Sequence, residues 1–192
     1  MVRKYQPRAR LLGFGILCVL CAATVLHLAL PGFASDSVGK RMEKVRQDIR
    51  MRYPGVRHIR TAALADWLAD TNRVPPLLLD VREEAEYAVS HLQGARRVEP
   101  GELPAQWLQM LARDRPIVVY CSVGERSSDF ASTLQGLDFS HVFNLDGSIF
   151  QWANEGRPLF SGNQAASLVH PYDRRWGRLL EKTYHPPRER KP

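Results

Sequence analysis

The chain has 192 residues, of which 44% are hydrophobic and 24% are charged, as in globular proteins and unlike disordered ones. Its net charge of +7 comes from the two ends, because the stretch from Ser35 to His170 holds 16 basic and 17 acidic residues. A domain that binds nucleic acid needs a basic face of its own. The near-neutral middle of the chain therefore argues against nucleic-acid binding.

The first 34 residues have the features of a signal anchor or a signal peptide. Residues 11–30 contain sixteen apolar side chains and no charged one, which is long enough to span a bilayer core as a helix. The basic cluster in residues 1–10 predicts a cytoplasmic start, so that the rest of the chain lies on the outer, periplasmic side of an inner or plasma membrane. The alternative is a cleaved signal peptide, with cleavage near Ala34 and release into the periplasm.

Residues 35–55 follow as a helical linker, in which a charged helix over 37–52 ends at Pro54-Gly55. We interpret this helix as a spacer between the membrane and the domain. Residues 161–192 form a basic, Pro-containing extension at the other end of the chain. We expect this extension to pack on the domain, and docking of a partner is the alternative.

Between these flanks, residues 56–160 read as one domain in which strands and helices alternate. Apolar runs and amphipathic spacing predict strands over 77–79, 95–98, 117–120 and 142–144, and helices over 61–70, 83–89, 126–135 and 148–154 with a further helix whose apolar face is Leu103, Trp107, Leu108 and Leu111. This alternation predicts an α/β fold with a parallel sheet and helices on both faces.

Cys121 is the only cysteine outside the apolar N-terminal segment, and it directly follows the strand at 117–120. It opens a loop that continues as Ser122, Val123, Gly124, Glu125, Arg126 and Ser127. A thiolate needs positive potential, which loop N–H groups, the start of a helix near Arg126 and the guanidinium can supply. A buried structural cysteine is the alternative, but the glycine and the arginine favour a nucleophile.

Asp80 directly follows the predicted strand at 77–79, as Cys121 follows the strand at 117–120. Because reactive sites of parallel sheets lie off the carboxyl ends of the strands, we expect Asp80 and Cys121 to face one pocket.

Three ordered blocks resemble the rhodanese family, from about Val56 to Leu159. The first signature is Leu-Asp-Val-Arg at 79–82 with Glu86-Tyr87 and His-Leu-Gln-Gly-Ala at 91–95; the second is Asn-Leu-Asp-Gly at 144–147 with Trp152, Gly156 and Pro158. The Cys121–Arg126 loop resembles the active-site loop of that family. The resemblance implies a three-layer domain with a central five-stranded parallel sheet, and a sulfurtransferase that carries sulfane sulfur as a Cys121 persulfide.

The family resemblance also implies the reaction partners and the supporting residues. The donor would be a small sulfur-containing anion such as thiosulfate, or a persulfide, and the acceptor a thiol or a protein cysteine, with no cofactor and no metal. Asp80 and Arg82 would support the site as scaffold. We expect His91 to be a packed histidine, and Ser127 to cap the following helix rather than donate to the persulfide.

Three positions depart from the family pattern. Ser90 and Ser148 stand where the signatures usually have glycine, which we expect to be tolerated if their φ angles are negative. Glu125 places a negative charge inside the loop. At a separation of about 6 Å and an effective dielectric of about 20, it would cost roughly 3 kcal/mol per unit of donor charge.

Three other functions remain open. Related phosphatases have five residues between the cysteine and the arginine, whereas only Ser122 to Glu125 intervene here, which favours sulfur over phosphate. The domain could also be a non-catalytic binding or sulfur-relay module that docks a partner protein. Thiol redox chemistry would need a resolving cysteine from a partner.

Overall fold

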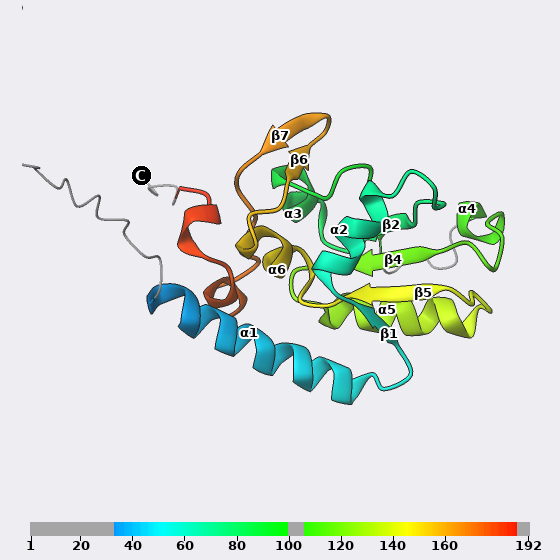
Figure 1. Ribbon diagram of the computed structural model, residues 1–192, viewed down its shortest axis with the longest axis horizontal. Helices are drawn as coiled ribbons and strands as arrows, with labels where there is room; N and C mark the ends of the chain where they lie inside the picture. The colour runs from blue at the N-terminus through cyan, green and yellow to red at the C-terminus, as the bar shows by residue number, and fades with distance from the viewer. Residues whose placement is uncertain (1–32, 100–105, 188–192) are drawn as a thin grey trace, which may run out of the picture. The chain divides into compact units, whose positions relative to one another are not determined.

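The computed structural model describes residues 33–99 and 106–187 of the chain (Figure 1). Its helices are α1 (Phe33–Arg52), α2 (Thr61–Ala69), α3 (Glu84–Val89), α4 (Gln106–Gln109), α5 (Glu125–Gly136), α6 (Ser148–Asn154) and the 3₁₀ helices η2 (Trp176–Leu179) and η3 (Lys182–Tyr184). Its strands are β1 (Arg57–Ile59), β2 (Leu77–Asp80), β3 (Arg96–Arg97), β4 (Ile117–Tyr120), β5 (Val142–Leu145), β6 (Leu159–Ser161) and β7 (Gln164–Ala166).

Five strands form one parallel sheet in the order β1-β5-β4-β2-β3, which confirms the predicted fold class. β4 lies at the centre, with Tyr120 opposite Asp80 of β2 and Val119 opposite Asn144 of β5. All five strands end at the same edge of the sheet because they run in parallel. The residue that follows β4 therefore emerges in the middle of that edge.

The alternation of side chains along β4 divides the core into two layers. Val118 and Tyr120 belong to a buried cluster that includes residues of α1, α2 and α6, whereas Ile117 and Val119 belong to a second cluster with residues of α4 and α5. Both faces of the sheet are thus covered by helices, as expected for a parallel sheet whose strands are continuously apolar.

The strand β1 was not among the strands predicted individually. It spans three residues, Arg57–Ile59, and pairs in parallel with β5, with Arg57 opposite Phe143. Its sequence, Arg-His-Ile, lacks the apolar run by which β2 and β4 could be recognised. The helix predicted from the apolar face Leu103, Trp107, Leu108 and Leu111 is seen in part: Leu103 lies outside the described residues, and α4 covers only Gln106–Gln109.

The helix α1 packs on the domain instead of standing apart from it as a spacer. Met42 and Ile49 are buried in the cluster that also contains α2 and α6. The guanidinium groups of Arg46 and Arg50 lie 2.7 and 2.6 Å from the same oxygen of Asp146, which follows β5. Apolar burial and these ion pairs together join α1 to the carboxyl edge of the sheet.

The C-terminal extension also packs on the domain, as expected. The hairpin of β6 and β7 is joined to the rest by mutual backbone hydrogen bonds between His91 and Phe160. Further along, Val169, Leu179 and Leu180 are buried in the same cluster as α1 and α6. Figure 1 shows this segment, coloured red, beside α1, and a hydrogen bond of 3.3 Å links Arg41 to the carbonyl of Arg178.

Residues 1–32 of the predicted signal anchor or signal peptide, which include its apolar stretch 11–30, lie outside the described residues. Within residues 33–99 and 106–187, no helix has both the length and the apolar character needed to cross a membrane.

The packing of α1 can be tested by comparing two substitutions on this helix. Ile49 is 3% exposed, whereas Met51 is 72% exposed. We expect Ile49→Ala to lower the free energy of unfolding by about 2–5 kcal/mol, because it removes buried methyl groups and leaves a cavity. Met51→Ala, the control, should change it by less than about 0.5 kcal/mol. Urea denaturation measures both, and equal small effects would mean that α1 does not belong to the core.

Candidate active site

The loop that carries Cys121 leaves the sheet at the end of β4 and turns directly into α5. The helix begins at Glu125, one residue earlier than predicted, after Gly124 with a φ of 112°. A Cβ atom at Gly124 would lie 3.2 Å from the side-chain nitrogen (Nδ2) of Asn144. Glycine is needed here because L side chains avoid this backbone conformation and because β5 lies close.

The start of α6 holds the loop from one side. The N–H groups of Ile149 and Phe150 donate to the carbonyls of Cys121 and Ser122 at 3.2 and 3.1 Å. Because the C=O and N–H groups of a trans peptide point in opposite directions, the N–H groups of Ser122 and Val123 lie on the side away from α6. On the sulfur itself, the N–H of Gly124 donates to Sγ of Cys121 at 3.2 Å.

Ser148 adds a side-chain contact to this arrangement, and its backbone differs from the expected one. Its φ is +51°, so the condition of a negative φ under which serine was expected to be tolerated is not met here, whereas Ser90 meets it with an extended φ of −168°. The hydroxyl of Ser148 accepts from the N–H of Cys121 and donates to the carbonyl of Leu145, both at 3.1 Å. These two hydrogen bonds tie the end of β5 to the first residue of the loop.

Glu86 is the residue that the sequence analysis missed, although it belongs to the first signature. Its carboxylate is buried and accepts from both terminal nitrogens of Arg126, at 2.8 and 2.9 Å. It also accepts from the hydroxyl of Ser122 at 2.7 Å. Arg126 donates in turn to the Ser122 hydroxyl at 3.0 Å. The guanidinium is thereby held against the loop by a carboxylate from α3.

Burial and ion pairing act in opposite directions on this pair. Burial disfavours the charged form of Glu86, but the hydrogen bonds and charge of Arg126 outweigh it and hold the pKa of Glu86 below its usual value. Burial likewise disfavours the charged form of Arg126, but Glu86 and the negative charge of a Cys121 thiolate raise the pKa of Arg126. Arg126 is therefore a permanent cation that interacts electrostatically with Cys121.

Asp80 and Arg82 are both fully buried and form an ion pair. Arg82 donates from its side chain to both oxygens of Asp80, the shortest bond being 2.6 Å, and at the same distance to the carbonyl of Ser90. Neither residue lines the cavity at Cys121, so the expectation that Asp80 faces that pocket is wrong. The pair instead joins the end of β2 to the residue that follows α3, the helix that carries Glu86.

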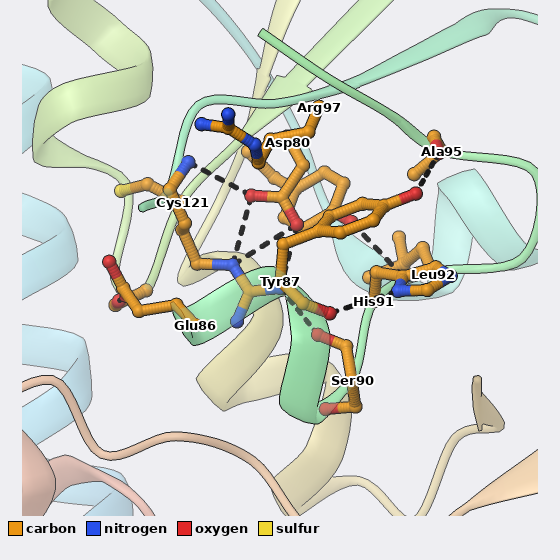
Figure 2. Close-up of polar contacts among 12 residues, drawn as sticks. Asp80, Glu86, Tyr87, Ser90, His91, Leu92, Ala95, Arg97 and Cys121 are labelled. Carbon is orange, nitrogen blue, oxygen red and sulfur yellow. Dashed lines mark hydrogen bonds and ion pairs between the residues drawn. The ribbon is translucent and has the colours of Figure 1, made fainter. Parts of the chain in front are cut away.

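Ser127 and His91 are both structural. Ser127 lies inside α5 and donates to the side-chain oxygen of Asn144 at 2.6 Å, so it neither caps the helix nor contacts the sulfur, contrary to the expected capping role. His91 is packed, as predicted: its ring stacks on Tyr87 with centroids 4.0 Å apart (Figure 2).

A cavity of about 110 Å³ opens beside Cys121. Cys121 is only 1% exposed, so a reactant reaches its sulfur through this cavity. Glu125 lies at the cavity and forms an ion pair with Arg52 of α1. The lining residues are Cys121, Ser122, Val123, Glu125, Arg126, Tyr172 and Trp176.

The last two lining residues come from the C-terminal extension, and sequence reasoning did not place them in the site. The Tyr172 ring lies 4.6 Å from the guanidinium carbon of Arg126. The signal available in the sequence was a short amphipathic stretch with Trp176, Leu179 and Leu180, but it did not show which part of the domain the tail covers.

The five-stranded parallel sheet, with Cys121 directly after its central strand and helices on both faces, defines the class of protein as a three-layer α/β domain. The chain belongs to the rhodanese-like domain family, because the sequence model of that family matches residues 61–155.

Relatives of this chain include sulfurtransferases. A "Sulfurtransferase" of Allochromatium vinosum is 34% identical over 104 residues, which cover 54% of this chain and 94% of that protein. "Thiosulfate sulfurtransferase GlpE" of Pseudomonas fluorescens is 28% identical over 96 residues, covering 44% and 87%. Among solved structures, a rhodanese-related protein of Thermoplasma volcanium aligns with a TM-score of 0.47 and 28% identity, over 54% of this chain and 97% of that one.

The hydrogen bonds of Ser148 lead to a comparison of two variants. Ser148→Ala leaves the buried N–H of Cys121 without its acceptor and keeps a side chain at positive φ, so we expect a loss of about 1–3 kcal/mol in unfolding free energy. Ser148→Gly also removes the acceptor but relaxes the backbone, which recovers about 1 kcal/mol. Urea denaturation should therefore rank the wild type above the glycine variant and the alanine variant last. An alanine variant as stable as the wild type would contradict this role.

The Glu86–Arg126 pair predicts a pH-dependent contribution to stability. Because the pKa of Glu86 is below its ordinary value of 4.5 in the folded protein, its stabilisation is complete above that pH and is lost as pH falls through the folded value. We expect Glu86→Gln to cost about 2–3 kcal/mol at pH 7, with the difference from the wild type narrowing as pH falls below about 4.

The control for this measurement is Glu84→Gln on the same helix. Its side chain is 72% exposed and pairs with Arg97, so its effect should stay below about 1 kcal/mol. Denaturation curves at several pH values measure both variants. A Glu86→Gln difference that does not change between pH 7 and pH 3 would refute the assignment.

Proposed function

We propose that the protein is a sulfurtransferase in which Cys121 receives a sulfane sulfur atom and passes it to a nucleophilic acceptor. The observation that carries this proposal is the position of Cys121. Its sulfur lies at a cavity, accepts a loop N–H and stands beside a guanidinium held by Glu86. Membership of a family whose relatives include sulfurtransferases supports the same reaction class.

The reaction has two displacement steps. The Cys121 thiolate attacks the outer sulfur of a donor such as thiosulfate; the new S–S bond forms as the old one breaks, and sulfite leaves with the electron pair of that bond. The acceptor then attacks the terminal sulfur of the Cys121 persulfide, and the thiolate is regenerated. With cyanide the product is thiocyanate. This is ping-pong, covalent catalysis.

The loop supplies stabilisation for the terminal anion of the persulfide. The N–H groups of Ser122 and Val123 lie away from α6 because their carbonyl partners are held by that helix. The first N–H groups of α5 have no partner within the helix. Donors fixed before the reaction stabilise developing negative charge without reorganisation, as in an oxyanion hole.

The charges at the cavity bear on the identity of the donor. Glu86 is paired with Arg126, and Glu125 is paired with Arg52. The repulsion that Glu125 would exert on an anionic donor is therefore reduced by a cation from α1. These four side chains sum to zero net charge, so attraction of an anion such as thiosulfate comes from the backbone N–H groups. We propose thiosulfate or a small persulfide as the donor.

Intact-mass analysis of the purified chain tests the reaction. After exposure to thiosulfate or a persulfide donor, we expect an adduct of about 32 Da, one sulfur atom, that cyanide removes. Cys121→Ser should form no such adduct. The matched control is the double variant Cys18→Ser/Cys21→Ser, which retains Cys121 and should keep the adduct in full.

Two outcomes would overturn the proposal. No adduct on Cys121 in a sample whose thiol is free for alkylation would favour the binding-module alternative. Turnover of an aryl phosphate that is lost in Cys121→Ser would favour a phosphatase, against the four-residue spacing between Cys121 and Arg126.

A further inference from the structure

The C-terminal segment 169–184, here called the strap, is held firmly at both ends. The N–H of Val169 donates to the carbonyl of Tyr184 at 2.7 Å, which closes the segment on itself. The side chain of Asn154 in α6 donates to the carbonyl of Leu179 at 2.8 Å and accepts from the N–H of Glu181 at 2.9 Å. Because Val169, Leu179 and Leu180 are buried as well, the strap is a fixed part of the domain.

Tyr172, within the strap, adopts an unusual backbone conformation although it is not buried in the core. Its φ is +63°, which is an outlier for a bulky residue, yet its side chain is 40% exposed. The N–H of Tyr172 donates to the ring of His170 at 3.1 Å, and its own ring covers the guanidinium of Arg126. Strained residues persist where the surrounding structure holds them, frequently at functional sites. Here the strained residue lines the cavity at Cys121.

Trp176 is positioned by a turn around Asp173. The carboxylate of Asp173 accepts from the N–H groups of Arg175 and Trp176 at 2.7 and 2.8 Å. Gly177 follows, where a Cβ atom would lie 3.0 Å from Pro171, so the turn packs tightly. Two aromatic side chains, four residues apart, are thereby presented to the same cavity.

The size of the cavity limits what fits beside the sulfur. A cavity of about 150 Å³ accommodates benzene, which has six non-hydrogen atoms. The cavity here measures about 110 Å³. This volume suits an ion such as thiosulfate, which has five non-hydrogen atoms. An acceptor thiol on a folded protein or a tripeptide would bring its backbone against the cavity wall, to which Tyr172 and Trp176 belong.

We propose that Tyr172 and Trp176 determine specificity for the sulfur acceptor, restricting it to small nucleophiles such as cyanide, sulfite or a thiol of the size of cysteine. The proposal rests on the proposed sulfurtransferase function and narrows its acceptor. Without the two rings, the cavity would open toward the surface and admit larger thiols.

The test measures discharge of the Cys121 persulfide in single turnovers. The full chain is loaded with sulfur, and its discharge rates with cyanide, glutathione and a folded protein carrying one exposed cysteine are compared. We expect the wild type to favour cyanide strongly, and this preference to fall by about tenfold or more in Tyr172→Gly and in Trp176→Ala. Tyr172→Phe keeps the ring and should retain the wild-type preference.

Glycine is chosen at position 172 because it adopts positive φ without strain, so that the ring is removed from a backbone that stays in place. The melting temperature and the circular dichroism of each variant verify folding, and Trp176→Ala provides an independent removal of one wall.

The outcomes separate the two proposals. If the persulfide does not form in the wild type or in any variant, the sulfurtransferase function fails. If it forms but the rate ratio between cyanide and the larger thiols is the same in all variants, the specificity role fails while the function stands. Wild-type discharge to the protein thiol as fast as to cyanide would also overturn the specificity role.

Discussion

The site depends on the hydrogen bonds between the loop after β4 and the start of α6. Two N–H groups of α6 hold the carbonyls of Cys121 and Ser122, and the hydroxyl of Ser148 holds the N–H of Cys121. These bonds fix which way the loop peptides face, because a trans peptide cannot present its N–H and C=O on one side. The parallel sheet makes the contact possible, since β4 and β5 are neighbours and end at the same edge.

Arg126 is not a free cation next to Cys121, because its guanidinium is paired with the carboxylate of Glu86. Its bidentate contact with Glu86 and its bond to Ser122 form a charge-assisted network within the loop. Such a network orients the guanidinium and partly offsets its charge. The backbone N–H groups on the side of the loop away from α6 lie beside this network as further hydrogen-bond donors.

Segments outside the family match complete the site. Residues 61–155 supply the cysteine loop, Glu86 and four of the five strands of the sheet, since β1 (Arg57–Ile59) precedes them. Arg52 from α1 pairs with Glu125, and the strap adds Tyr172 and Trp176 to the cavity wall. α1 and the strap also contact each other through Arg41 and Arg178. The residues of the family match are therefore flanked by two segments that contribute side chains next to the Cys121 loop, while the loop itself lies within the family match.

Local features of the sequence were sufficient to predict the strands β2 and β4, the loop that carries Cys121 and the family. Apolar runs and short motifs consist of residues that are adjacent in the sequence, so they can be recognised without the fold. The strand β1 escaped because three residues with two polar side chains resemble a loop until β5 pairs with them. Tertiary structure alone decided that Glu86 meets Arg126 across 40 positions, and that Tyr172 covers the same guanidinium. It also decided the positive φ of Ser148, which the helix start and two hydrogen bonds impose. Contacts between distant residues arise only when the sheet order brings their elements together, and no local pattern records that order.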